Sequence, residues 1–388
     1  MNELVIGTMF ALIRRVVCGK ELSEDVKASI TPELLPQLYA ISKGHDVAHI
    51  VAQGLTELGV LGEDPISQKF QKQQMLAVYR YQRLNYELQQ ACAALEDAKI
   101  PFIPLKGSVI RKYYPEPWMR TSCDIDVLVH EEDLEKASLV LEETLSYQNK
   151  GKGAHDVSLF SPSGIHLELH FDTVEDDYAN HAIRVLADMW SHAAPQSGCE
   201  AHCVLTDEMF YFYHIAHMAK HFEDGGCGVR PFLDLWILEH CVEHDKATRD
   251  ALLDSGDFLT FANACRRLSA VWFDGAGADE TMKQTEAYIL HGGVYGTVDN
   301  RVAVQQKKSG GKLRYALSRI ILPYDTLKIH YAILEKHKWL TPFMQVRRWF
   351  KLLFRGGVKS SLYELNANQS MSQERIKGTA ELFEKIGL

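Results

Sequence analysis

The sequence of 388 residues lacks the features that would mark a membrane-spanning or a disulfide-rich secreted protein. There is no run of about 18 or more apolar residues, the length a spanning helix needs. The apolar N-terminal stretch follows Glu3 and precedes Arg14 and Arg15, the reverse of the charge order in a secretory signal. The eight cysteines are scattered and form no CxxC pair, so we expect reduced thiols. These absences predict a cytoplasmic protein without a transmembrane segment.

Acidic residues are scarce in one part of the chain. The whole sequence has a formal net charge of −9, yet residues 301–360 contain 14 Lys or Arg against only Asp325 and Glu335. Aromatic residues are interleaved with these basic residues. Three interpretations stay open: a nucleic-acid surface, an amphipathic surface on an anionic membrane, or core rings beneath solvated charges.

The spacing of apolar residues predicts an α+β protein in which a small α/β core is embedded between helical regions. The predicted segments are a helical region at 1–99, the α/β core at 100–175, a second helical region at 176–291, a flexible loop at 292–312, and a basic helical region at 313–388. The loop is predicted from its many glycine and polar residues. Within 180–290, the expected helices are 180–190, 207–222, 231–243, 248–274 and 280–290.

The α/β core is predicted from short apolar runs separated by Gly and Pro. The expected elements are a strand at 102–105, a short helix at 108–114, a strand at 125–129, a helix at 131–145, and a hairpin of 157–160 with 165–171. In the last strand, IHLELHF, apolar residues alternate strictly with His166, Glu168 and His170. That alternation predicts one buried and one polar face.

Two carboxylates, Asp124 and Asp126, begin the strand at 125–129. Residues i and i+2 of a strand point to the same side, so these carboxylates repel each other unless a cation lies between them. The turn Gly107-Ser108 at a helix start offers N–H groups to a phosphate. Together these residues are typical of metal-assisted phosphoryl or nucleotidyl transfer. Glu168 is the candidate third acid, as a metal ligand or as a general base.

These motifs resemble the uncharacterised nucleotidyltransferase family of bacteria, in the DNA polymerase β-like superfamily. The segments that carry the resemblance are LKGSVI at 105–110, Tyr113-Tyr114, Pro117-x-x-Arg120, Asp124-Ile-Asp126-Val-Leu-Val, and His166-Leu-Glu168-Leu-His170. A weaker resemblance runs through 207–240 and touches Pro323 and Arg347-Arg348. It implies a mixed sheet and the transfer of a nucleoside monophosphate from an NTP to a hydroxyl, with two Mg²⁺ ions, or Mn²⁺, as cofactors.

Specific roles follow from the resemblance. Asp124 and Asp126 would hold the metal ions, and Gly107 and Ser108 would contact the terminal phosphates of the nucleotide. Charge and position suggest further phosphate contacts from Lys106 and Arg120. Arg230 and Asp234, four residues apart, either form an ion pair within one helix or position the nucleotide or the acceptor.

Several functional alternatives stay open at this stage. His217 and His221 are spaced to share a metal, which would suit a metallohydrolase, or they and His214 belong to a helical core or line the nucleotide cleft. A non-catalytic nucleotide- or RNA-binding module that kept the fold is the main alternative to an enzyme. The acceptor hydroxyl is a sugar or antibiotic, an RNA end, or a protein side chain.

Overall fold

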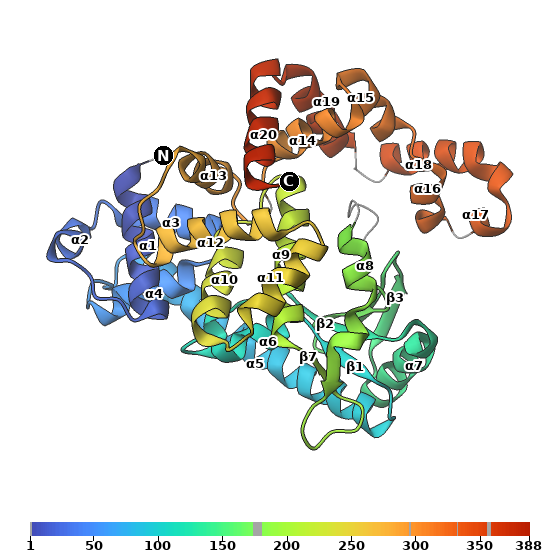
Figure 1. Cartoon of the computed structure of the whole chain (residues 1–388), viewed down its shortest axis with the longest axis horizontal. Helices are drawn as coiled ribbons and strands as arrows, with labels where there is room; N and C mark the ends of the chain where they lie inside the picture. The colour runs from blue at the N-terminus through green and yellow to red at the C-terminus, as the bar shows by residue number, and fades with distance from the viewer. Residues whose placement is uncertain (1, 174–180, 295, 332, 355–357) are drawn as a thin grey trace.

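A computed structural model describes residues 2–173, 181–294, 296–331, 333–354 and 358–388. Along the chain, a five-stranded mixed sheet lies between an N-terminal helical region and a larger C-terminal helical region; Figure 1 shows the sheet at the lower right of the molecule. The predicted α+β fold class is therefore confirmed. Within these residues, the helices lack the combination of length and apolar character that crossing a membrane requires.

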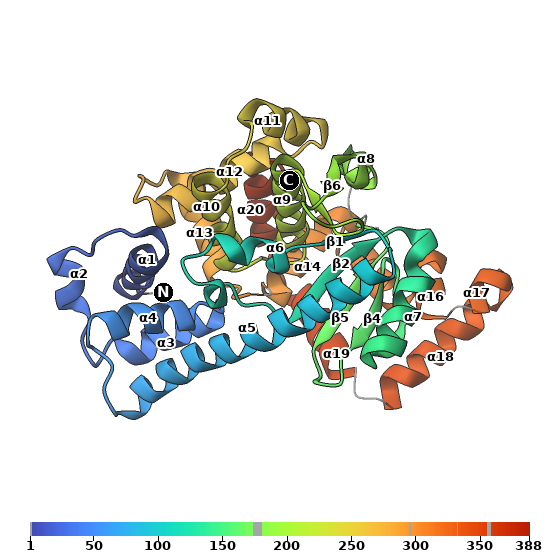
Figure 2. The ribbon, with the colours of Figure 1, turned by 90° about the horizontal axis from the view of Figure 1, so that it is seen from below.

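The N-terminal region is helical, as predicted. It consists of α1 (Glu3–Cys18), α2 (Glu24–Ser29), α3 (Leu35–Gly44), α4 (Ala48–Glu57) and α5 (Pro65–Asp97). The side chain of Asp64 caps α5 by accepting hydrogen bonds from the backbone N–H groups of Ile66 and Ser67. With 33 residues, α5 is about 50 Å long. Figure 2 shows it running from the N-terminal helices to the sheet, so it packs against both.

The sheet has the strand order β1-β2-β5-β4-β3. Its strands are β1 (Phe102–Pro104), β2 (Asp124–Val129), β3 (Gln148–Lys152), β4 (Asp156–Phe160) and β5 (His166–His170). The neighbours β2 and β5 run parallel, and the other neighbouring pairs are antiparallel. Strand β3 was not predicted, because its sequence QNKGK is exposed throughout and has no apolar alternation.

Alternation along the strands gives the sheet two chemically different faces. Ile125, Val127 and Leu167 are buried in an apolar layer that also contains residues of α5 and of α7 (Leu134–Leu145). Asp124 and Asp126 therefore point to the opposite face. One strand pattern thus sets both the core and the position of the carboxylates.

The second helical region covers the carboxylate face. Before it lie α6 (Gly107–Ile110) and short 3-10 turns at Arg111–Tyr113, Pro117–Met119 and Glu131–Asp133. It contains α8 (His181–Ala187), a 3-10 turn at Met189–His192, the small β6 (Ala193–Pro195) and β7 (Cys203–Leu205) hairpin, α9 (Asp207–Glu223), α10 (Arg230–Cys241), α11 (Lys246–Ser255), α12 (Leu259–Phe273) and α13 (Glu280–Leu290). The single helix predicted at 248–274 is two helices, because Asp257 adopts a left-handed φ of 61° between them.

The prediction of a flexible loop at 292–312 is wrong for the centre of this segment, where α14 (Val298–Ser309) forms. The Thr297 side chain caps this helix by accepting from the N–H of Asn300, and Val302 packs against Tyr315 in a small core. The glycines flank the helix and do not interrupt it. The chain continues as α15 (Lys312–Ile320), α16 (Tyr324–His330), α17 (Ile333–Lys336), a 3-10 turn at Lys338–Leu340, α18 (Thr341–Phe354), α19 (Val358–Ser370) and α20 (Gln373–Ile386). The other predicted domain boundaries stay predictions.

Candidate active site

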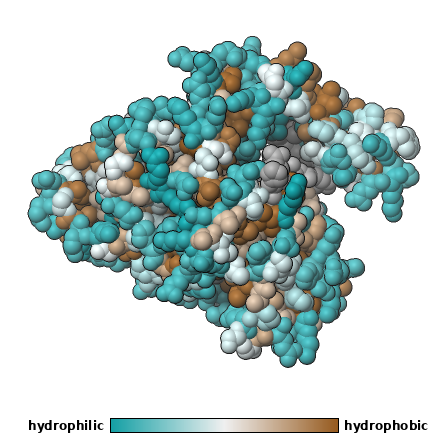
Figure 3. All heavy atoms as spheres, viewed as in Figure 1, coloured by the Kyte–Doolittle hydropathy of each residue, from teal (hydrophilic) through white to brown (hydrophobic). Residues whose placement is uncertain are grey.

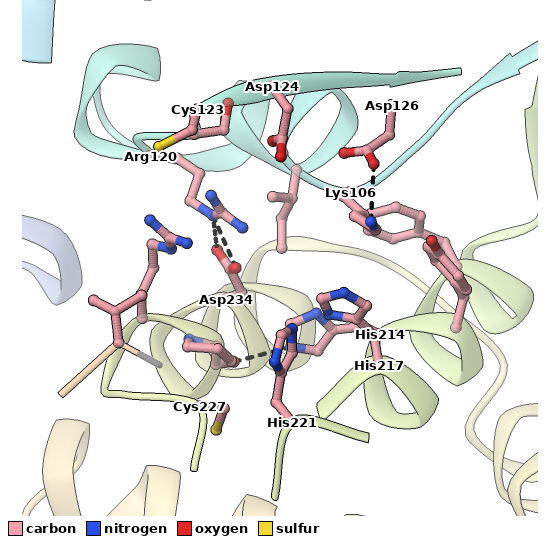
Figure 4. A pocket seen from close by; sticks show the side chains of 18 residues that line it. Lys106, Arg120, Cys123, Asp124, Asp126, His214, His217, His221, Cys227 and Asp234 are labelled. Atoms are coloured by element: carbon pink, nitrogen blue, oxygen red, sulfur yellow. Dashed lines mark hydrogen bonds and ion pairs between the residues drawn. The ribbon is translucent and has the colours of Figure 1, made fainter. Parts of the chain in front are cut away.

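A cavity of about 270 Å³ lies between the carboxylate face of the sheet and helices α9 and α10 (Figure 4). The predicted site residues that line it are Lys106, Gly107, Arg120, Asp124, Asp126, Arg230 and Asp234. Its wall on α9 and the following loop includes Tyr213, His214, His217, His221 and Cys227. Two segments about a hundred residues apart therefore face each other across one cavity.

The paired aspartates of β2 both point into this cavity (Figure 4). Burial and the nearby charge of Asp126 raise the pKa of Asp124. Burial alone would also raise the pKa of Asp126, but Lys106 and His170 outweigh it and hold that pKa below its usual range. The Lys106 ammonium group lies 2.8 Å from Asp126 Oδ1. The site therefore keeps the Asp126 carboxylate ionised, while the pKa of the neighbouring Asp124 is raised.

Glu168 lies directly beside Asp126. Strand β5 pairs in parallel with β2, and the two residues are opposite each other in the register. Two positions further along β5, the buried His170 ring places Nε2 3.0 Å from Asp126 Oδ1 and 3.4 Å from Glu168 Oε2. The contact with His170 lowers the pKa of Glu168. Burial opposes the charged form of His170, but its contacts with the two carboxylates raise its pKa.

Asp126, Glu168 and His170 form a group that could hold a metal ion. One ligand atom of each residue lies within 4.8 Å of the ligand atoms of the other two. Among the described residues, this is the group of His, Cys, Asp or Glu side chains that is close enough to share a metal ion. The sequence left the roles of the histidines on β5 open. The structure separates them, because His166 contacts the Ser158 hydroxyl at 2.7 Å, stacks on Phe160 and lies outside the group, with its Nδ1 3.8 Å from Glu168 Oε1.

The donor atoms of this group fit a divalent cation. Carboxylate oxygens suit Mg²⁺ and Mn²⁺, while an imidazole nitrogen is more usual for transition metals such as Mn²⁺ than for Mg²⁺. The Lys106 ammonium group already supplies one positive charge to Asp126, so a metal ion would have to share or displace it. Asp124 lies outside the compact group, although it lines the same cavity.

The Lys-Gly-Ser turn is divided between two cavities. Gly107 begins α6 and lines the carboxylate cavity, where a Cβ atom would lie 3.4 Å from Arg120 Nη1 and 3.3 Å from Ser122 Cβ. Ser108 lines a separate cavity with Lys112, and its backbone N–H donates to the Leu105 carbonyl at 3.2 Å. The structure thus places Gly107, but not Ser108, beside the paired aspartates.

The ion pair within α10 that the spacing of Arg230 and Asp234 allowed does not form. Arg120 Nε donates to both carboxylate oxygens of Asp234, at 2.7 and 2.8 Å. The Tyr114 hydroxyl donates to the same carboxylate at 2.7 Å. Arg230 Nη1 instead lies 2.7 Å from Asp46 Oδ2. Partners from distant segments thus replace the neighbour on the helix, for the buried Asp234 and for the half-buried Arg230 alike.

The histidines of α9 belong to the cavity wall. His214 Nε2 lies 2.9 Å from the Pro231 carbonyl, and the rings of His217 and His221 are 4.4 Å apart. Burial lowers the pKa of all three, to about 4 for His221, so they are neutral near pH 7. Among the described residues, His217 and His221 gain no third ligand that would complete a metal group.

Comparison with known families agrees with this geometry. A family model described as uncharacterised nucleotidyltransferase matches residues 32–274, more than half of the chain. The chain belongs to this family. The match covers α3 to α12 and thus both walls of the cavity, and it ends before Pro323 and Arg347-Arg348. No curated protein and no solved structure matches the chain.

In this nucleotidyltransferase family member, the roles of several site residues were not expected from the sequence. These are His170 of the possible metal group, Tyr114 as a hydrogen-bond donor to Asp234, Asp46 as the ion-pair partner of Arg230, and Tyr213 in the cavity wall. His170 had a signal, because it shares the polar face of β5 with Glu168. Tyr114 belongs to the Tyr113-Tyr114 pair that carries the family resemblance, but the pair does not indicate a contact with Asp234. Asp46 and Tyr213 had no signal, since each reaches the site only through packing of distant elements.

Proposed function

We propose that the protein is a metal-dependent nucleotidyltransferase that moves a nucleoside monophosphate from an NTP to a hydroxyl group of an acceptor. The observation that carries the proposal is that Asp124 and Asp126 of β2 line one cavity, with Glu168 of the adjacent parallel strand opposite Asp126 in the register. Basic residues on the same cavity complement a triphosphate. Membership of a nucleotidyltransferase family supports the same chemistry.

The carboxylates would serve as the metal-binding side. Asp126, Glu168 and His170 would hold one Mg²⁺ or Mn²⁺ ion, and Asp124 with Asp126 would hold a second. Such ions, when bound, polarise the transferred phosphate and favour ionisation of the attacking hydroxyl. Glu168 is either a ligand or the base that accepts the hydroxyl proton, since its lowered pKa keeps it ionised near pH 7.

The basic residues would serve as the phosphate side. Lys106 and Gly107 lie at the end of the cavity next to Asp126, and Arg230 lies on its α10 wall. The Arg230 guanidinium still has a buried Nε without a hydrogen-bond partner, although Nη1 is paired with Asp46. A phosphate oxygen would satisfy that nitrogen. Arg120 is held by Asp234, so this pair positions the wall around the nucleotide.

The proposal is tested by incubating the protein with NTPs labelled in the α-phosphate, Mg²⁺ or Mn²⁺, and cell lysate as a source of acceptors. We expect labelled product with the wild type and none with Asp126→Asn. Asp97→Asn, at the exposed end of α5, is the matched control and should behave as the wild type.

Two results would contradict the proposal. Absence of labelled product under every metal condition would argue against catalysis. Metal-independent NTP or RNA binding that survives Asp124→Asn and Asp126→Asn would instead indicate a non-catalytic binding module. The chemical nature of the labelled product would identify the acceptor class, whether sugar, RNA end or protein side chain.

A further inference from the structure

Helix α15 exposes a stripe of large apolar side chains. Leu313, Leu317 and Ile320 are spaced i, i+4 and i+7 and are 74%, 48% and 44% exposed. The opposite side of the helix holds it in place, because Tyr315 is buried and its hydroxyl bonds to Glu364 of α19. The helix is therefore anchored to the protein by one face while its apolar stripe faces solvent.

A second stripe of exposed apolar side chains runs from the 3-10 turn at Lys338–Leu340 into the start of α18. Trp339, Phe343 and Val346 have the same i, i+4, i+7 spacing and are 69%, 63% and 44% exposed. The remainder of α18 is attached by polar contacts, since Arg348 Nη1 and Trp349 Nε1 both donate to the Ile320 carbonyl, at 3.0 and 2.9 Å. These contacts attach α18 to the C-terminal end of α15.

We call the six residues of these stripes the apolar patch. Its members are Leu313, Leu317, Ile320, Trp339, Phe343 and Val346. Figure 3 shows hydrophobic side chains gathered over α15 and the adjoining helical arm, and Figure 1 shows that α16–α18 project from the body of the protein. Rings and aliphatic chains that a globular core would bury are therefore presented outward on a projecting element.

Basic residues surround the apolar patch. Arg314 lies beside Leu313, and the exposed Arg347 and Lys351 follow Val346 on α18. The patch belongs to residues 301–360, where 14 Lys or Arg stand against two acidic residues. It therefore combines exposed apolar side chains with strong local positive charge. Of the three interpretations left open by the sequence, the core-ring one fails for Trp339 and Phe343, which are largely exposed.

We propose that the apolar patch docks the protein on the surface of an anionic lipid bilayer. Aromatic and aliphatic side chains enter the interfacial region of a bilayer, while Lys and Arg attract its anionic headgroups. Single-stranded nucleic acid would match the charge and the rings. It does not account for Leu313, Leu317, Ile320 and Val346, because aliphatic chains provide no stacking surface for bases. A bilayer accounts for all six residues.

The bilayer proposal is tested by co-sedimentation of the full-length protein with lipid vesicles. Vesicles of phosphatidylcholine with about one-third phosphatidylserine should bind the protein at low salt, and vesicles of phosphatidylcholine alone should bind it far less. Trp339→Ser/Phe343→Ser should weaken binding about tenfold or more, because two large apolar contacts are lost. Tyr79→Ser/Tyr86→Ser on α5 removes two rings of 60% exposure and should leave binding unchanged.

A charge-reversal pair tests the electrostatic contribution separately. Arg347→Glu/Lys351→Glu should also weaken binding about tenfold or more, and this effect should shrink at high salt. Lys72→Glu/Lys283→Glu makes the same change in net charge at exposed sites elsewhere and should have little effect. Thermal unfolding of each variant checks that the fold is retained.

Three results would overturn the bilayer proposal. The first is wild-type protein that does not sediment with anionic vesicles, and the second is equal loss of binding in the patch and control variants. The third is patch-dependent binding of single-stranded RNA without vesicle binding. Because these measurements need no NTP, their outcome is independent of the proposed transferase activity.

Discussion

Arg120 binds Asp234 across 114 residues of sequence, through Nε contacts of 2.7 and 2.8 Å with both carboxylate oxygens. Arg120 belongs to the α/β core and Asp234 to helix α10, so the pair joins the two walls of the cavity. Burial disfavours both charges, but their mutual attraction lowers the pKa of Asp234 and raises that of Arg120. The cavity keeps its shape through a contact that neither segment forms alone.

Asp234→Ala should destabilise the protein by about 3–5 kcal/mol, because the buried Arg120 guanidinium would lose its counter-charge and Tyr114 its acceptor. Urea unfolding followed by circular dichroism measures this change. Glu24→Ala is the control, since it removes an ion pair with Lys27 whose Glu side chain is 88% exposed, and stability should hardly change. Equal effects of the two substitutions would contradict the structural role assigned to the Arg120–Asp234 pair.

Asp126→Asn should weaken Mn²⁺ binding and abolish nucleotidyl transfer. Substitution of a residue that only supports a metal ligand typically lowers metal affinity roughly 10–100-fold. The loss for Asp126→Asn should be larger, because Asp126 is proposed as a direct ligand. Titration of Mn²⁺ followed by electron paramagnetic resonance provides the measurement, with EDTA-treated protein as the starting state. Asp97→Asn should bind Mn²⁺ as the wild type does; retention of full Mn²⁺ affinity in Asp126→Asn would remove the basis for the metal site.

His170 substitutions distinguish a metal ligand from a residue that orients Asp126. If His170 Nε2 is a ligand, His170→Gln should lower the affinity for Mn²⁺ more than that for Mg²⁺, because imidazole suits Mn²⁺ better. We expect this selective loss. Equal retention of both affinities would show that the side chain only donates a hydrogen bond to Asp126, which the glutamine amide can replace. His291→Gln, at an exposed position at the end of α13, is the control and should leave both affinities unchanged.

Gly107→Ala should reduce NTP affinity about 10–100-fold, because a Cβ atom would lie 3.3 Å from Ser122 Cβ and the cavity wall would have to shift. Isothermal titration calorimetry with a non-hydrolysable NTP analogue measures the NTP affinity. Gly7→Ala is the control within α1, where a Cβ atom meets nothing within 4 Å. It should leave NTP affinity unchanged and raise stability by about 1 kcal/mol through helix propensity. An unchanged NTP affinity in Gly107→Ala would place the phosphates elsewhere.

Stability should fall as the pH is lowered below about 6.5. Burial lowers the pKa of His49, His214 and His217, so the unfolded chain binds protons there more readily than the folded chain does. Each such histidine contributes stability that is complete above its unfolded pKa and decreases below it, by up to about 1.4 kcal/mol per pH unit. Thermal unfolding at pH 7.5 and 5.5 measures the difference.

A single substitution tests the contribution of one histidine to this pH dependence. His49→Gln should flatten the decline, because the amide can still donate to the Met119 carbonyl but does not titrate. His291→Gln, an exposed histidine at the end of α13, should leave the pH dependence as it is. An identical pH dependence in His49→Gln and the wild type would show that burial of His49 carries none of the effect.

The sequence determined the sheet face that carries the chemistry. Strict alternation in β2 and β5 places Asp124, Asp126, Glu168 and His170 on one side because a strand has a period of two, whatever surrounds it. The motif order was sufficient to indicate the family that the comparison confirms. Local periodicity could not find β3 or α14, whose polar sequences gain their structure from neighbouring elements.

Only the tertiary structure decided which charges meet. Asp234 is four residues from Arg230 in the chain, yet it pairs with Arg120, and Arg230 pairs with Asp46, 184 residues away. Only the tertiary structure also decided that the rings of α18 are exposed, because exposure depends on whether another element covers the helix. Periodicity is a property of a segment and can be read from it. Ion-pair choice and burial depend on how segments pack, so they became known only when the chain was folded.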